Sequence, residues 1–164
     1  MMMLAAEAAG FLDTVENLGI STWVRESPSK FAYPTVLLLH VIGMGVVAGL
    51  ASIISLRLLG ISPSIPVRPL ERLYPVIWWG FWVNAVTGTG LLMASATKRG
   101  VDPVFYIKML FIFAGLAVLQ RTRKKVFHNL GPGDALPDGS KGLAWAALVC
   151  WLGAITAGRL LAYL

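Results

Sequence analysis

Apolar residues gather into four long runs, over about 31–59, 73–97, 103–130 and 142–164, and short polar segments separate them. An α-helix rises about 1.5 Å per residue, so about 20 residues cross the hydrocarbon layer of a bilayer. Each run reaches that length. The pattern therefore predicts an all-α protein, an up-down bundle of four transmembrane helices in a domain over residues 31–164.

The third run is the shortest in strongly apolar residues, which cover only 104–120. Helix-compatible residues continue to Leu130, where Gly131-Pro132-Gly133 follows. Glycine suits the C-terminal cap of a helix and proline cannot continue one. We therefore expect this helix to extend beyond the membrane.

The N-terminal tail, residues 1–30, contains a second kind of pattern over 10–26. Apolar and small side chains recur there at helical spacing, and the acidic residues lie largely elsewhere. The members of this stripe are Phe11, Val15, Leu18 and Thr22. The pattern predicts a short amphipathic helix on the outer membrane surface, and a partner protein could equally cover its apolar face.

Composition supports a membrane protein, because 57% of the 164 residues are hydrophobic and only 13% are charged. The net charge of +6 comes from basic residues at the ends of the apolar runs, which favours lipid head groups over nucleic acid as the partner. One side of the predicted bundle carries eight Lys and Arg residues and the other carries four. The positive-inside rule then predicts both termini on the non-cytoplasmic side, which would be the periplasm in the inner membrane of a bacterium. The eight are Arg57, Arg68, Arg72, Arg121, Arg123, Lys124, Lys125 and Lys141.

The acidic residues all lie outside the apolar runs. Proton pumps and cation-coupled transporters usually need carboxylates within the membrane, so their absence argues against both classes. It also leaves no paired carboxylates for hydrolysis, and no nucleophile-and-base set is present. We expect no catalytic activity of this chain's own.

Small residues recur every four positions in three of the runs. Such stripes let helix backbones approach closely in lipid. They predict either packing inside the bundle or a docking face for another membrane subunit. The stripes are Gly45 and Gly49, then Gly80 and Gly88 with Asn84 midway between them, and Gly153 and Ala157.

Basic and soft side chains are the candidates for a binding site. The up-down topology places six of them in the outer half of the bundle: His40, Met44, Met93, Lys108, Met109 and Arg159. Histidine and methionine are axial ligands of haem iron, and Lys or Arg could hold the propionates. The same soft set could hold Cu(I). We consider haem b the better candidate, with His40 as the metal ligand, although methionine also fills gaps and Lys and Arg can snorkel.

Histidine pairing within the chain is not expected. His128, the other histidine, lies about 27 Å deeper than His40 by helical rise, further than one porphyrin spans.

Several segments together resemble an uncharacterised bacterial family of small four-helix membrane proteins: YPTVLLLHVIGMGVVAG with SLRLLG, FYIKML, and WLGAITAGRLLAY. The chain is more distantly similar to copper-resistance D-type and b-type cytochrome membrane bundles. The resemblance covers about residues 20–164 and implies a four-helix bundle. Its matching polar positions are His40, Arg57, Lys108 and Arg159.

Two functions follow as hypotheses. In the first, the chain is an accessory subunit of a larger membrane complex of the redox or electron-transfer kind, and it docks through its glycine-rich faces. In the second, it is a membrane electron-transfer protein that binds haem b or copper through His40.

Overall fold

The computed structural model describes residues 10–26, 31–128 and 136–163. All regular secondary structure in these ranges is helical, and four helices are long and apolar enough to cross a membrane. The all-α four-helix bundle predicted from the sequence is thus confirmed. Leu130 and Gly131-Pro132-Gly133, the predicted end of the third helix, lie outside the described residues.

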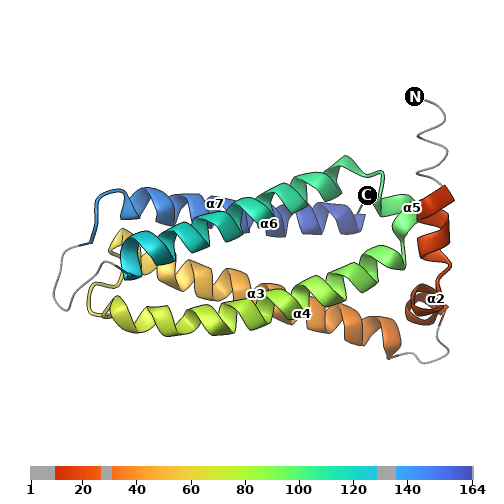
Figure 1. Ribbon diagram of the computed structural model, residues 1–164, viewed down its shortest axis with the longest axis horizontal. Coiled ribbons are helices and arrows are strands. Elements are labelled where there is room, and N and C mark those ends of the chain that lie inside the picture. Colours follow the sequence, from red (N-terminus) through yellow and green to blue (C-terminus); the bar gives the residue numbers. More distant parts are fainter. Residues whose placement is uncertain (1–9, 27–30, 129–135, 164) are drawn as a thin grey trace.

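The helices alternate in direction along the chain (Figure 1). They are α3 (Ala32–Leu59), α4 (Tyr74–Met93), α6 (Pro103–Thr122) and α7 (Ser140–Tyr163). A 3-10 turn, η1 (Arg68–Leu73), precedes α4, and a π-helical turn, η2 (Arg123–Phe127), extends α6. α3 packs against α4 and α7, and α6 packs against α7.

Local sequence explains where several helices begin and end. Gly60 ends α3 in a left-handed conformation, with φ of 92°. Its N–H donates to Arg57 O, and Ile61 N–H donates to Leu56 O, which completes a Schellman motif. Asp102 caps α6, because its Oδ1 accepts from Val104 N–H at 2.8 Å.

The second predicted helix, 73–97, differs from the structure. α4 ends at Met93, and a separate short helix, α5 (Ala96–Arg99), follows. The break falls at Ser95, whose φ of −146° and ψ of 38° are not helical. The break changes the direction of the chain, so Arg99 lies in a different place from the one it would have in a continuous helix.

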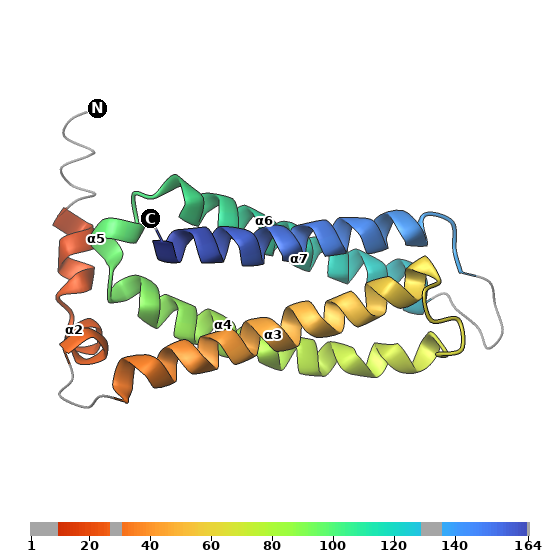
Figure 2. The ribbon, with the colours of Figure 1, turned by 180° about the vertical axis from the view of Figure 1, so that it is seen from behind.

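The N-terminal pattern also forms two helical pieces instead of one. Residues 10–16 are helical, and α2 (Gly19–Glu26) follows a break at 17–18. Both pieces lie at one end of the bundle, where residues 10–16 are next to α5 and α2 is near the start of α3 (Figures 1 and 2). The exposed apolar side chains in this segment include Phe11, Leu18 and Trp23.

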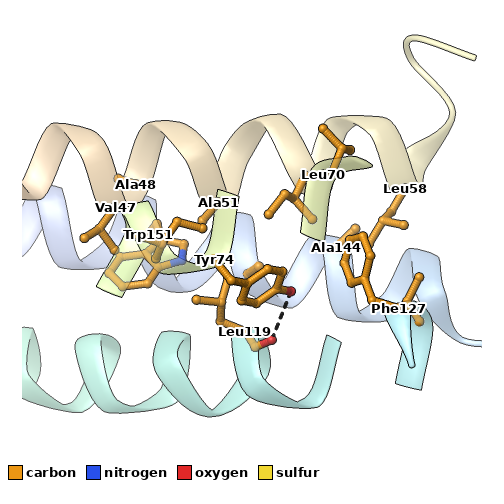
Figure 3. Packing of buried hydrophobic residues seen from close by; sticks show 14 of the residues in the cluster. Val47, Ala48, Ala51, Leu58, Leu70, Tyr74, Leu119, Phe127, Ala144 and Trp151 are labelled. Carbon is orange, nitrogen blue, oxygen red and sulfur yellow. Dashed lines mark hydrogen bonds between the residues drawn. The ribbon is translucent and has the colours of Figure 1, made fainter. Parts of the chain in front are cut away.

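The two ends of the bundle differ. We call the end at which α3 begins and α7 ends the open end, and the opposite end the packed end. The helices spread apart toward the open end (Figure 2). The buried core lies in the other half, where the Tyr74 hydroxyl donates to Leu119 O at 3.3 Å and the rings of Tyr74 and Phe127 meet edge to face (Figure 3).

Candidate functional site

A cavity of about 290 Å³ lies between the helices at the open end. Residues of α3, α4, α5, α6 and α7 line it, so it belongs to the whole bundle and not to one helix pair. Its polar side chains include His40, Arg99, Lys108 and Arg159. A smaller cavity of about 20 Å³ shares Met44 and Lys108 with it.

His40 is held in one orientation by α4. Its Nδ1 lies 3.0 Å from Asn84 O and 3.3 Å from Thr87 Oγ1. The Asn84 amide Nδ2 lies 3.3 Å from the same Nδ1. Because a carbonyl oxygen can only accept, the shorter contact with Asn84 O favours the tautomer with the proton on Nδ1 and the lone pair on Nε2. The Asn84 amide donates in return to His40 O at 2.7 Å. No hydrogen bond within the described residues uses Nε2, which is therefore available to a ligand.

Gly88 makes room for the imidazole. A methyl group on Gly88 would lie 2.8 Å from His40 Cε1 and 3.2 Å from His40 Nδ1. The ring therefore packs directly onto the α4 backbone. Gly88 therefore makes space for a side chain of the candidate site. The four-residue spacing in the sequence predicted only helix packing or docking for it.

Three cations surround the same cavity. The stem of Lys108 lies over Gly158 of α7, where an added methyl group would be 3.5 Å from Lys108 Cε. Arg99 lies on α5, and Arg159 is exposed near the end of α7. The charges of Arg99 and Lys108 repel each other. No carboxylate among the described residues lines the cavity, and none pairs with these three side chains.

The mouth of the cavity is apolar. Tyr33, Leu37 and Val41 line it from successive turns of α3, and their side chains are 43%, 40% and 49% exposed. Ala162, near the end of α7, is exposed as well. Because α3 and α7 are membrane-spanning candidates, this mouth would face acyl chains. The lining thus combines three cationic side chains, of which Arg159 is exposed, with an exposed apolar strip on α3.

The predicted binding residues are only partly brought together. His40, Met44, Lys108 and Arg159 line the cavity, whereas Met93 and Met109 do not. Met109 follows Lys108 directly, and successive helical residues point about 100° apart. His40 and Met44 lie one turn apart on α3, so they cannot take opposite sides of one haem iron.

Sequence analysis missed Arg99 and the mouth residues Tyr33, Leu37 and Val41. Tyr33, Leu37 and Val41 are spaced four residues apart on α3, as His40 and Met44 are, so this helical spacing could have predicted that they share a side of the helix. Arg99 carried no such signal, because its position depends on the break at Ser95. Within the described ranges, no group of three or more His, Cys, Asp or Glu could hold a metal ion.

The glycine stripes divide into two groups. Gly80 packs on Val46 and Gly153 packs on Phe111, where an added methyl group would come within 2.8 Å and 2.7 Å of the neighbour. Ala157 is buried. Gly45 and Gly49 have open space beside them and lie on the exposed surface. Docking of another subunit on that face stays a prediction.

Comparisons of the chain with protein families, with curated proteins and with solved structures found no match. The resemblance to small four-helix membrane proteins, and to copper-resistance D-type and b-type cytochrome bundles, therefore stays a prediction. The proposed function therefore rests on the residues that line the open-end cavity.

Proposed function

We propose that this chain binds an anionic amphiphile in the membrane, with the head group in the open-end cavity and the apolar tail in the mouth. The observation that carries the proposal is the set of three cations, Arg99, Lys108 and Arg159, around a cavity that no carboxylate of the described residues lines. We further propose that the open end faces the periplasm of a bacterial inner membrane, because the Lys- and Arg-rich side is expected to be cytoplasmic.

Charge is the main argument for an anion. Cationic side chains at membrane depth are costly unless they are paired or solvated. Lys108 is about five residues into α6, or about 8 Å along the helix by its rise, and its stem is packed against α7. An anionic group would offset this cost and would accept charge-assisted hydrogen bonds.

Shape supports the same ligand class. A volume of about 290 Å³ is close to the lower limit of ordinary ligand pockets, which hold about 300 to 1,000 Å³. A lipid head group is small enough for that space. The exposed Tyr33, Leu37 and Val41 provide an apolar path by which a tail would remain in the bilayer.

Native mass spectrometry of the detergent-solubilised protein tests the proposal. We expect phosphatidylglycerol to bind and phosphatidylcholine with the same acyl chains not to bind. Lys108→Gln should weaken phosphatidylglycerol binding by about tenfold, the equivalent of one lost charge-assisted hydrogen bond. Lys98→Gln, which removes a charge outside the cavity, is the matched control. Equal binding of both lipids, or equal loss in both variants, would overturn the proposal.

Iron porphyrin is a second candidate, and the geometry of His40 favours it. Metal-binding histidines usually donate one ring N–H to a carbonyl or carboxylate and bind the metal through the other nitrogen. The bond from Nδ1 to Asn84 O leaves Nε2 in that state. His40 would then be the single axial ligand, and the cations would hold the propionates.

A reduced-minus-oxidised visible spectrum of the gently solubilised protein decides on this candidate. Haem bands that are present in the wild type and absent in His40→Ala would support it. His128→Ala, at the other end of the bundle, should leave the bands intact. A colourless wild-type protein would exclude bound haem.

A further inference from the structure

We infer that the head group of the amphiphile is a phosphate monoester, in which a terminal phosphate joins the lipid through a single ester bond. This inference rests on the proposed function and narrows its ligand class. Its basis is the combination of three cations with one hydrogen-bond acceptor, His40 Nε2, in a single cavity.

The number of cations favours more than one negative charge. Arg99, Lys108 and Arg159 line the cavity, and no carboxylate in the described part of the chain does. A phosphodiester head group carries one negative charge and would leave two of the three cations uncompensated. A phosphate monoester carries about −1.5 to −2 at pH 7 and has three terminal oxygens. Its oxygens can meet the fork-shaped guanidinium groups and the ammonium together.

His40 supplies the feature that separates the two ester classes. In the tautomer with Nδ1–H toward Asn84 O, Nε2 accepts a hydrogen bond. A singly protonated monoester can donate its P–OH hydrogen there, and transfer of that proton to Nε2 would leave the phosphate dianion next to an imidazolium, so the phosphate reaches the double charge that the three cations favour. The phosphate of a diester has no such hydrogen.

The apolar mouth favours a lipid as the ligand. Tyr33, Leu37 and Val41 are all exposed and all line the cavity, so a tail attached to the phosphate would leave through them. A soluble phosphate monoester would meet the three cations but would gain nothing from this surface. Affinity should therefore depend on both parts of the molecule.

Competition in native mass spectrometry tests the inference with the full chain. The probes are phosphatidic acid, a monoester, and phosphatidylmethanol, its methyl diester with the same acyl chains. We expect phosphatidic acid to bind about tenfold more tightly, the effect of one hydrogen bond to a charged group. His40→Phe should remove that preference and leave the weaker binding of phosphatidylmethanol. His128→Phe should leave the preference unchanged, because His128 does not line the cavity.

Gly88→Ala gives an independent variant in case His40→Phe does not fold. It keeps the imidazole but displaces it, since the added methyl group would lie 2.8 Å from His40 Cε1. It should also reduce the preference for phosphatidic acid. Glycerol phosphate, which has the head group without a tail, should compete poorly.

The outcomes separate the two levels of the proposal. Equal affinity for the two phospholipids would overturn the monoester inference and leave anionic lipid binding intact. No binding of either would overturn both. Competition by glycerol phosphate at the affinity of phosphatidic acid would show a soluble ligand, and would overturn the assignment to a lipid.

Discussion

Two glycines of α4 that lie two residues apart have different surroundings in this bundle. Gly88 faces the imidazole of His40, whereas an added methyl group on Gly90 would meet nothing within 4 Å. Both lie on α4, so they share the intrinsic preference of alanine over glycine in a helix, about 1 kcal/mol. A comparison of Gly88→Ala with Gly90→Ala therefore measures the effect of the contact with His40, apart from the general effect of replacing a helical glycine by alanine.

We expect Gly88→Ala to weaken phosphatidic acid binding and Gly90→Ala to leave it unchanged. The physical reason is the displacement of His40 from Asn84 O, to which it is bonded at 3.0 Å. Binding of phosphatidic acid by native mass spectrometry is the measurement. Equal affinities for the two variants would show that the position of His40 does not matter to the ligand.

A similar contrast on α3 tests which glycines hold the bundle together. A methyl group on Gly43 would lie 2.8 Å from Asn84 N and 2.8 Å from Gly80 O, both backbone atoms that cannot turn away. We expect Gly43→Ala to destabilise the fold by about 1–3 kcal/mol, the usual cost of overpacking. Gly45→Ala should be neutral or stabilising. Unfolding in SDS measures both.

The same variants bear on the predicted accessory role. If another membrane subunit docks on the face of Gly45 and Gly49, alanine there should reduce co-purification without lowering stability. Unchanged co-purification would contradict docking on this face.

Among the elements, the N-terminal segment is attached to α5 by specific contacts. The Glu16 carboxylate accepts from Thr97 N–H at 2.8 Å and from the Thr97 hydroxyl. A methyl group on Gly100 would lie 2.8 Å from Leu12 Cδ2, so Leu12 packs on the same turn. Arg99 lies between these two contacts and reaches the cavity. The segment thus fixes the element that carries one of the cations.

We expect Glu16→Gln to increase hydrogen exchange over Ala96–Arg99 and to weaken lipid binding by less than Lys108→Gln does. The carboxylate is a stronger acceptor than the amide that replaces it, and Arg99 is one cation of three. Asp13→Asn is the control, because the Asp13 carboxylate is bonded to Asn17 of its own segment. Equal exchange over α5 in both variants would refute a positioning role.

At the packed end, Tyr74 connects α4 to α6. Its hydroxyl donates to Leu119 O, its ring contacts Phe127, and the Arg123 guanidinium lies 5.4 Å from the ring centroid. Arg123 also pairs with Glu71 at 3.3 Å. The wider π turn of η2 thus coincides with the place where two of its residues, Arg123 and Phe127, meet Tyr74.

We expect Tyr74→Phe to lower the free energy of unfolding by about 0.5–1.5 kcal/mol, the net value of one hydrogen bond. Tyr163→Phe should have no effect, because Tyr163 is 83% exposed. SDS or thermal unfolding provides the comparison. A neutral Tyr74→Phe would mean that the bond to Leu119 O contributes nothing.

For the whole molecule, the orientation in the membrane is the main untested prediction. It can be measured with single cysteines in a Cys150→Ala background, since Cys150 is the sole cysteine. Lys98→Cys lies at the open end and Lys141→Cys at the packed end, and both positions are exposed. A membrane-impermeant maleimide added to intact cells should label the first and not the second. The reverse pattern would place both termini in the cytoplasm.

The fold was predictable from the sequence because apolar runs and turn residues are local signals. Gly60, Asp102 and the run lengths are examples. The candidate site was predictable in part: depth along each helix grouped His40 with Lys108 and Arg159. Helix rotation decides which side chains share a cavity, and spacing alone did not separate Met44 from Met93 or Met109. The position of Arg99 depends on the helix break at Ser95, which no residue in the sequence indicates strongly.

The uneven distribution of the core has a mechanical consequence. The pair α3 and α4 and the pair α6 and α7 are held together by a buried core near the packed end. A rigid tilt of one pair against the other would therefore take place about that core. A small tilt about that core would be amplified at the open end. We therefore expect the width of the open-end cavity to vary while the core stays packed.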